Sequence, residues 1–274
     1  MKKPLIILTG PTAVGKTKLS ISLAKAVNGA IISADSMQVY RHMDIGSAKI
    51  RPEEMCGVPH YLIDVLDPSE EFHVVKFVEL AHEAMEKIYA AGQIPIVTGG
   101  TGFYIQALLK EVDFTESHGE LPIRKQLEEK AATEEGAAEL YRELSEVDPA
   151  SAETIHPNNV KRVIRALEYY HETGQKISEH NEEQKQKESP YCSAYFVLND
   201  ERSILYDRID RRVDQMICDG LVDEVFRLKE MGYTRDLVSM QGLGYKELFP
   251  YLAGECTLEE AVYIIKRDTR HFAK

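Results

Sequence analysis

The sequence predicts an α/β fold, in which a parallel sheet flanked by helices is interrupted by an inserted small all-helical domain. Short apolar runs rich in Ile and Val alternate with longer amphipathic stretches over residues 4–110, as in parallel sheets that are covered on both faces. A glycine-rich loop directly follows the first apolar run. From about Asp113 the composition shifts to Glu, Lys and Ala, and no convincing strand pattern appears before residue 195.

The α/β part is expected to comprise residues 1–112 and 190–274, because a strand pattern resumes after the helical stretch. Its strands are expected at residues 5–8, 30–33, 61–65, 94–97 and 195–198. Apolar residues at helical spacing predict its helices. These are expected at residues 16–27, 74–91, 103–109, 202–231 (as one or two helices) and 258–272.

The insert, residues 113–189, is expected to contain two or three helices. Its length of about 75 residues is within the range of a small domain. The stretch 178–189 is highly charged, and we expect it to be solvated. The helices of the insert are expected at residues 121–134, 136–144 and 159–173.

The composition excludes several classes of protein. The net charge of −12 argues against a wholly basic nucleic-acid coat, although a local basic patch remains compatible with it. The four cysteines lie far apart and the nine histidines show no ligand spacing, so neither a zinc site nor a disulfide framework is indicated. No run approaches the ~20 apolar residues that span a bilayer. With no signal-peptide pattern either, we expect a cytoplasmic protein that has no membrane partner.

Residues 10–17 form the most informative local motif, because they fit G-x-x-x-x-G-K-S/T between a strand and a helix. The glycines let successive backbone N–H groups point at phosphate oxygens, and the helix N-terminus adds partial positive charge. Lys16 supplies a full charge, and the Thr17 hydroxyl can ligate Mg²⁺. We therefore expect a P-loop NTPase-like sheet, a bound polyphosphate and a Mg²⁺ cofactor at Thr17. The phosphate-binding residues are expected to be Gly10, Thr12, Ala13, Val14, Gly15, Lys16 and Thr17.

The loop alone does not define which phosphate compound binds. A nucleotide kinase or NTPase also needs a carboxylate at another strand end to hold Mg²⁺, yet the strand at 94–97 is followed by Thr98-Gly99-Gly100-Thr101-Gly102. The second strand leads instead to Asp35. This departure indicates that the phosphates belong to a leaving group. A small-molecule P-loop kinase and a non-catalytic, nucleotide-gated RNA-binding module remain as alternatives.

Six further segments extend the pattern over nearly the whole chain. They are residues 35–40 (DSMQVY), 43–49 (MDIGSAK), 99–104 (GGTGFY), 165–168 (RALE), 205–209 (LYDRI) with Arg212, and 241–247 (QGLGYKE). With the loop, this ordered set resembles the bacterial tRNA dimethylallyltransferase family. Two departures accompany the resemblance. The family normally continues past Lys274 into a basic, aromatic stretch, so the chain is expected to be cut short there, and Lys161 stands where relatives often carry Gln.

The resemblance implies that a dimethylallyl group passes from dimethylallyl diphosphate to N6 of an adenine beside the tRNA anticodon, and that pyrophosphate leaves. Its partners would be the anticodon stem-loop of tRNA and dimethylallyl diphosphate, and we expect the chain to act as a monomer. It also implies three catalytic residues, Asp35, Thr101 and Arg208. Asp35 follows a strand end, where α/β folds place their sites, and its carboxylate could take the proton that N6 must lose.

Arg208 could close over the departing pyrophosphate as a fork of donors, and Thr101 lies in a glycine-rich turn that allows close backbone approach. On the pattern alone, Asp35 or Thr101 could instead be a turn residue, and Arg208 could form a surface ion pair.

Binding of tRNA is expected at two places. The adenine must be flipped out of the stacked anticodon loop into a channel, which by resemblance is lined by Asp35, Ser36, Met37, Gln38 and Thr101. A basic cluster on the insert is expected to contact the tRNA backbone, and a solvated charged face is the alternative. The members of this cluster are Arg124, Lys161, Arg162 and Arg165.

Overall fold

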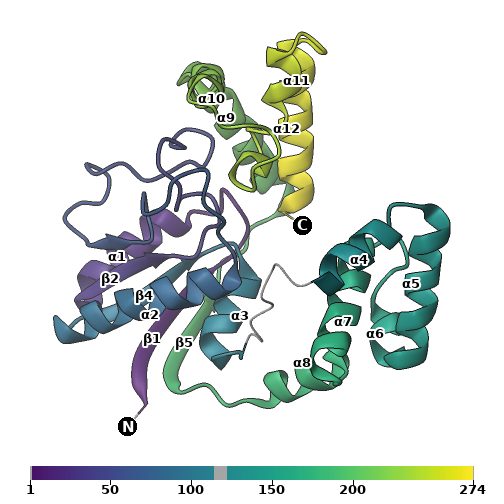
Figure 1. Ribbon diagram of the computed structural model, residues 1–274. Helices are drawn as coiled ribbons and strands as arrows, with labels where there is room; N and C mark the ends of the chain where they lie inside the picture. The colour runs from purple at the N-terminus through teal and green to yellow at the C-terminus, as the bar shows by residue number, and fades with distance from the viewer. Residues whose placement is uncertain (1, 114–121, 274) are drawn as a thin grey trace. The chain divides into compact units, whose positions relative to one another are not determined.

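The sheet is parallel throughout the part of the chain that the computed structural model describes, residues 2–113 and 122–273 (Figure 1). Its strand order is β3-β2-β4-β1-β5. The strands are β1 (Lys3–Thr9), β2 (Gly29–Ser33), β3 (His60–Tyr61), β4 (Ile94–Gly99) and β5 (Tyr191–Val197). The predicted α/β fold with a helix-flanked parallel sheet is confirmed.

Helices cover both faces of this sheet (Figure 1). The helices that belong with the sheet, and one short 3₁₀ turn, are α1 (Lys16–Val27), α2 (Val74–Ala90), α3 (Gly102–Lys110), α9 (Arg202–Cys218), α10 (Leu221–Glu230), η1 (Ser239–Gln241), α11 (Leu248–Leu252) and α12 (Leu258–Phe272). Ala24 of α1 packs in one apolar cluster with Ile31 of β2, whereas Phe77 of α2 packs in another with Ile32. Because successive strand residues point to opposite faces, α1 and α2 lie on opposite sides of the sheet.

The helices α9 and α12 pack against each other (Figure 1). α12 begins with a capping box, in which Thr257 and Glu260 each accept a hydrogen bond from the other's backbone N–H. Arg270 of α12 donates to both carboxylate oxygens of Asp210 on α9, at 2.6 and 2.7 Å. This ion pair fixes α12 along α9, so the two helices can present one continuous wall.

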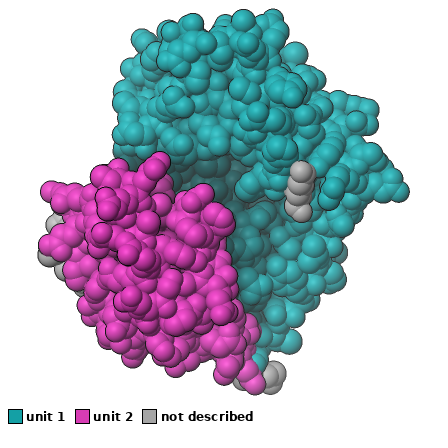
Figure 2. Space-filling view, turned by 90° about the vertical axis from the view of Figure 1, so that its right-hand side faces the viewer, with its two compact units in different colours: residues 1–109, 190–274 teal, residues 110–189 magenta. Residues whose placement is uncertain are grey.

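The chain divides into two compact units, which Figure 2 shows in different colours: residues 1–109 with 190–274, and residues 110–189. Lys110 belongs to the second unit, where its Nζ donates to the carbonyl oxygen of Lys187 at 2.7 Å. The second unit is helical in its described residues and packs around Leu140, Leu144 and Leu167. Its helices are α4 (Pro122–Lys130), α5 (Glu134–Val147), α6 (Pro149–Thr154), α7 (Val160–Thr173) and α8 (Ile177–Gln186).

Two sequence-based expectations for local structure need correction. The strand expected at 61–65 ends at Tyr61, because Leu62 and Asp64 have left-handed backbones, with φ of 62° and 56°. The insert has five helices in its described residues, where two or three were expected. The charged stretch 178–189 is mostly exposed, as expected, but much of it forms the additional helix α8. The buried carboxylate of Asp148 accepts hydrogen bonds from both N and Oγ of Ser178 and so fixes the start of this helix.

The helix expected to begin at Leu121 begins, within the described residues, at Pro122, and Leu121 itself lies outside them. Among the described residues, no helix has the length and apolar character needed to cross a bilayer.

Candidate active site

The loops after β1, β2 and β4 meet at the carboxyl edge of the sheet, where α/β folds place their ligands. The first of them is the P-loop. Gly10 has a φ of 148°, and a Cβ there would lie 2.4 Å from the carbonyl oxygen of Leu198, so only glycine fits. Ala13 and Gly15 also have left-handed backbones, with φ of 63° and 99°. The loop therefore curls tightly before α1 begins at Lys16.

Lys16 lies across this loop, and its Nζ donates to the carbonyl oxygens of Gly10 and Pro11 at 2.9 and 2.8 Å. Burial lowers the pKa of Lys16 to about 8, although the negative charge of Asp35 opposes that shift and the positive charge of Arg212 adds to it. Burial also lowers the pKa of Arg212, and Asp35 again opposes the shift. Two cations and one carboxylate therefore share one partly desolvated space.

Asp35 and Thr101 are brought together by close packing of the segments after β2 and β4. The backbone N of Ala34 donates to the carbonyl oxygen of Thr98 at 2.8 Å. A Cβ on Gly99 would lie 2.2 Å from the carbonyl oxygen of Ala34, so glycine alone permits this approach. The two loops then diverge around one cavity, which Asp35 and Thr101 both line.

The Asp35 carboxylate is held in one orientation by its own loop. Its Oδ1 accepts hydrogen bonds from the backbone N of Met37 at 2.8 Å and of Gln38 at 3.3 Å. This is the turn geometry that the sequence left open as an alternative for Asp35. It does not preclude a chemical role, because within the described chain no hydrogen bond occupies Oδ2.

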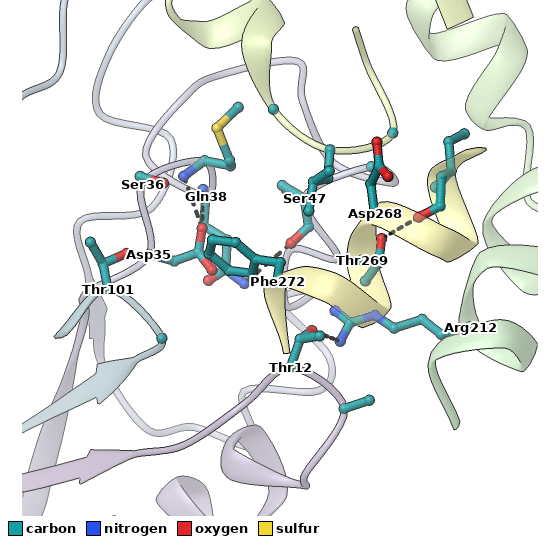
Figure 3. Close-up of a pocket in the computed structure, with 18 of the residues that line it drawn as sticks. Thr12, Asp35, Ser36, Gln38, Ser47, Thr101, Arg212, Asp268, Thr269 and Phe272 are labelled. Atoms are coloured by element: carbon teal, nitrogen blue, oxygen red, sulfur yellow. Dashed lines mark hydrogen bonds between the residues drawn. The ribbon is translucent and has the colours of Figure 1, made fainter. Parts of the chain in front are cut away.

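A cavity of about 910 Å³ lies above the P-loop and is large enough for a ligand (Figure 3). Ten of the sequence-predicted residues line it, all in the first unit: Thr12, Ala13, Gly15, Lys16, Thr17, Asp35, Ser36, Met37, Gln38 and Thr101. The remaining two predicted phosphate-binding residues, Gly10 and Val14, belong to the P-loop but do not line the cavity.

One wall of the cavity is apolar. Ile209, Val213 and Met216 of α9 line it, at the spacing of one helical face. Ile265 and Phe272 of α12 complete this wall. The cavity therefore combines a cationic, amide-rich floor with an apolar side, which suits a ligand that has both a phosphate group and a hydrocarbon group.

Arg208 does not line the cavity. Its Nη1 pairs with Asp200 at 2.8 Å, and its side chain is 46% exposed. Arg212, one helical turn further along α9, lines the cavity instead and donates from Nη1 to Oγ1 of Thr12 at 3.3 Å (Figure 3). In this structure Arg208 thus forms the surface ion pair that the sequence left open, and a catalytic role for it stays a prediction.

Sequence reasoning gave no site role to several residues that line the cavity. Gly46 and Ser47 belong to the segment 43–49, and a second group of lining residues belongs to the segment 241–247. Both segments carry the family resemblance, and their glycines were a signal of close backbone approach. Asp268, Thr269 and Phe272 of α12 also face the cavity (Figure 3), and no local motif marked them.

The predicted tRNA-binding cations Arg124, Lys161, Arg162 and Arg165 all lie in the helical unit, on α4 and α7. Nη1 of Arg124 and Nη1 of Arg165 both donate to one oxygen of Glu168, which is buried, at 3.3 and 3.0 Å. Lys161 and Arg162 are exposed, and no ion pair or side-chain hydrogen bond holds either within the described chain. Two members of the cluster, Arg124 and Arg165, are therefore held by Glu168, and the other two, Lys161 and Arg162, are open to solvent.

The fold and the cavity together define an α/β protein whose P-loop lies beside an apolar wall. Family models make the identification more specific. The chain matches the model described as "IPP transferase" over residues 38–274, and the one described as "Isopentenyl transferase" over residues 3–72. The chain belongs to the IPP transferase family.

Individual relatives agree with this assignment. The chain is 66% identical over 272 residues to the tRNA dimethylallyltransferase of Lachnoclostridium phytofermentans. This match covers 99% of this chain and 87% of that protein. Among solved structures, it resembles the tRNA isopentenylpyrophosphate transferase of Bacillus halodurans, with a TM-score of 0.73, 46% identity and coverage of 100% and 84%. It also resembles a eukaryotic dimethylallyltransferase described as acting on tRNA, with a TM-score of 0.85, 35% identity and coverage of 99% and 68%. The resemblance inferred from the sequence is confirmed.

Proposed function

We propose that this protein transfers the dimethylallyl group of dimethylallyl diphosphate to N6 of an adenine beside the tRNA anticodon. The observation that carries the proposal is one cavity that joins a P-loop, an acidic side chain and an apolar wall. Relatives named tRNA dimethylallyltransferase support both the reaction and the tRNA substrate. We further propose that the protein acts as a monomer in the cytoplasm, where tRNA is found.

The substrate would lie with its diphosphate on the P-loop and its five-carbon chain along the apolar wall. N6 attacks the first carbon of the chain, the bond between that carbon and the diphosphate oxygen breaks, and pyrophosphate leaves with the electron pair. Lys16, Arg212 and the loop amides face the oxygens on which charge accumulates, and such preorganised groups stabilise a transition state. Thr12 holds Arg212 in place through its hydroxyl.

A Mg²⁺ ion fits this arrangement. Mg²⁺ prefers oxygen ligands and usually combines few protein groups with substrate phosphates. The Thr17 hydroxyl borders the cavity, and no group of three His, Cys, Asp or Glu side chains able to hold a metal is found among the described residues. Thr17 would therefore hold the ion together with diphosphate oxygens and water, and a bound ion would neutralise charge on the leaving group.

The nucleophile is poor, because the lone pair of N6 is shared with the adenine ring, and it must lose a proton as the new bond forms. Asp35 is the acid at the end of β2 in this cavity, and its Oδ2 is available to take that proton. To reach it, the adenine must be flipped out of the anticodon loop. Ser36, Met37 and Gln38 would then line its path.

A P-loop kinase that acts on a small molecule is the alternative, and the relatives do not support it. The deciding experiment incubates the protein with unmodified tRNA, Mg²⁺ and either dimethylallyl diphosphate or ATP, and then analyses the nucleosides by mass. We expect one prenylated adenosine in the reaction that contains dimethylallyl diphosphate and none in the reaction that contains ATP. ATP turnover with a small acceptor and no need for RNA would instead make the protein a kinase.

The lowered pKa of Lys16 predicts a pH dependence. In the free enzyme Lys16 is charged below about pH 8 and neutral above it, so kcat/KM for dimethylallyl diphosphate should fall as pH rises through about 8. Bound diphosphate favours the charged amine, so kcat should stay level over the same range, because kcat reports the complex. A kcat/KM that stays constant for two pH units above this point would contradict the assignment.

The open half of the basic cluster predicts a change in salt dependence. For single-stranded RNA, the slope of log K against log salt falls by ~0.7 for each phosphate that the protein no longer neutralises. The double change Lys161→Ala, Arg162→Ala should thus lower the slope by up to ~1.4 and weaken tRNA binding. The matched control is Lys176→Ala, Lys185→Ala, which removes the same charge from residues paired with Glu179 and Glu182. Equal slopes for the two double variants would place the tRNA elsewhere.

A further inference from the structure

One buried carboxylate lies behind the cavity without lining it. Glu224 of α10 is 2% exposed. Its Oε2 accepts hydrogen bonds from the backbone N of Asp44 at 3.0 Å and of Ile45 at 2.8 Å. Its Oε1 accepts from the backbone N of Gly46 at 3.1 Å and from the Tyr245 hydroxyl at 2.7 Å.

These four bonds occupy the acceptor capacity of a carboxylate, which has about four lone-pair sites. No ion pair with Glu224 is seen among the described residues, so three consecutive amides and one phenol balance its charge. A buried carboxylate is costly unless such donors surround it. The arrangement is therefore specific to a group with four acceptor sites, and a neutral amide side chain could not reproduce it.

The first segment that Glu224 holds forms part of the cavity. Gly46 and Ser47 line it. The carbonyl oxygens of Ser47 and Ala48 lie 3.5 and 3.4 Å from Nε2 of Gln38, which donates to them. Gln38 also lines the cavity, and its Oε1 accepts from the Ser33 hydroxyl at 3.1 Å. The bonds to Glu224 thus fix the backbone that orients the Gln38 amide.

The second segment is the loop around Tyr245, whose side chain is fully buried. A Cβ on Gly46 would lie 2.5 Å from the Tyr245 ring, so the two segments are in close contact. Gly242 and Gly244, which both precede Tyr245 in the chain, line the cavity. A Cβ on Gly242 would lie 2.5 Å from the terminal methyl of Met37. Glu224 therefore joins two segments that come together at one wall.

We propose that Glu224 is a positioning residue that holds the wall of the cavity against which the acceptor adenine is placed. This inference rests on the proposed function. The wall formed by Gln38, Gly46 and Gly242 consists of peptide groups and one amide, which match the hydrogen-bonding edges of a base. The P-loop side carries Lys16 and Arg212 and matches the diphosphate. Loss of Glu224 should therefore impair the use of tRNA far more than the use of the diphosphate.

The test compares Glu224→Gln with Tyr245→Phe. The amide keeps the shape but places an NH₂ group against backbone N–H donors, so the wall must shift. A shifted wall weakens the binding of tRNA, and each ~1.4 kcal/mol of lost binding free energy is tenfold. We therefore expect the KM for tRNA to rise about 10-fold or more, whereas the Kd for dimethylallyl diphosphate changes less than about twofold. Tyr245→Phe removes one of the four bonds and should give a smaller effect in the same direction. The matched control is Glu230→Gln, at the exposed end of the same helix.

Two results would overturn the proposal: an unchanged KM for tRNA in Glu224→Gln, or equal losses for both substrates that follow the loss of thermal stability. If Glu224→Gln does not fold, Tyr245→Phe provides the test. A KM for tRNA that does not rise more than the Kd for dimethylallyl diphosphate in Tyr245→Phe would then contradict the proposal. Measurement of prenyl transfer by the wild-type protein distinguishes the two hypotheses. If the wild type transfers no prenyl group, the proposed function is wrong; if it does, only the role of Glu224 is in question.

Discussion

Replacement of Lys16 by alanine should lower kcat/KM for dimethylallyl diphosphate by ~10²–10³-fold, the loss typical for one preorganised group that stabilises developing negative charge. Lys16 supplies the ammonium group of the P-loop, and its Nζ donates hydrogen bonds to the carbonyl oxygens of Gly10 and Pro11. Without it, Arg212, whose charge acts on Lys16 in the same cavity, remains beside the P-loop. The readout is steady-state kinetics with tRNA at saturation and the diphosphate varied.

Two variants make this experiment specific. Lys18→Ala removes the same charge from the same helix at an exposed position and should change kcat/KM little. Arg212→Ala should also lower kcat/KM, but it acts through a guanidinium that Thr12 holds. If Lys16→Ala loses less than about 10-fold, or if ATP binds in the micromolar range while dimethylallyl diphosphate does not, the diphosphate does not occupy this loop.

The sequence predicts those parts of the fold whose determinants are local. Helices at 16–27 and 258–272 match α1 and α12 at both ends. The first has its left-handed glycine, Gly15, immediately before it, and the second has its capping box within four residues. The P-loop is predictable for the same reason, because one short segment carries both the turn geometry and the charge.

Contacts between distant residues explain what the sequence could not predict. Arg208 and Arg212 are one helical turn apart, so helical spacing alone does not distinguish them. A hydrogen bond to Thr12, 200 residues away, distinguishes them in the structure. Glu224 lies about as far from the loop that it holds, since its bond to Asp44 joins residues 180 apart. Neither relation leaves a local pattern.

The Asp35→Asn variant should slow the chemical step by ~10²–10⁴-fold, the usual cost of removing a general base. Asparagine suits this test unusually well, because its side-chain oxygen can still accept the bonds from the backbone N of Met37 and Gln38. The loop should therefore keep its shape, and only the proton acceptor at Oδ2 is lost. Single-turnover rates at saturating tRNA give the chemical step separately from binding.

The choice of pH matters for this variant, because the charge of Asp35 raises the pKa of Lys16. Its loss lowers that pKa below about 8, so the comparison belongs on the acidic side of neutral pH, where the amine is charged in both proteins and binding of dimethylallyl diphosphate should change little. Asp44→Asn is the matched control, since Asp44 is exposed and pairs with Lys49 at 2.7 Å. A purely structural role for Asp35 predicts lower thermal stability and weaker binding, with chemistry slowed only in proportion. Retention of more than about half of the wild-type single-turnover rate, far short of a general-base loss, would show that Asp35 is not the base.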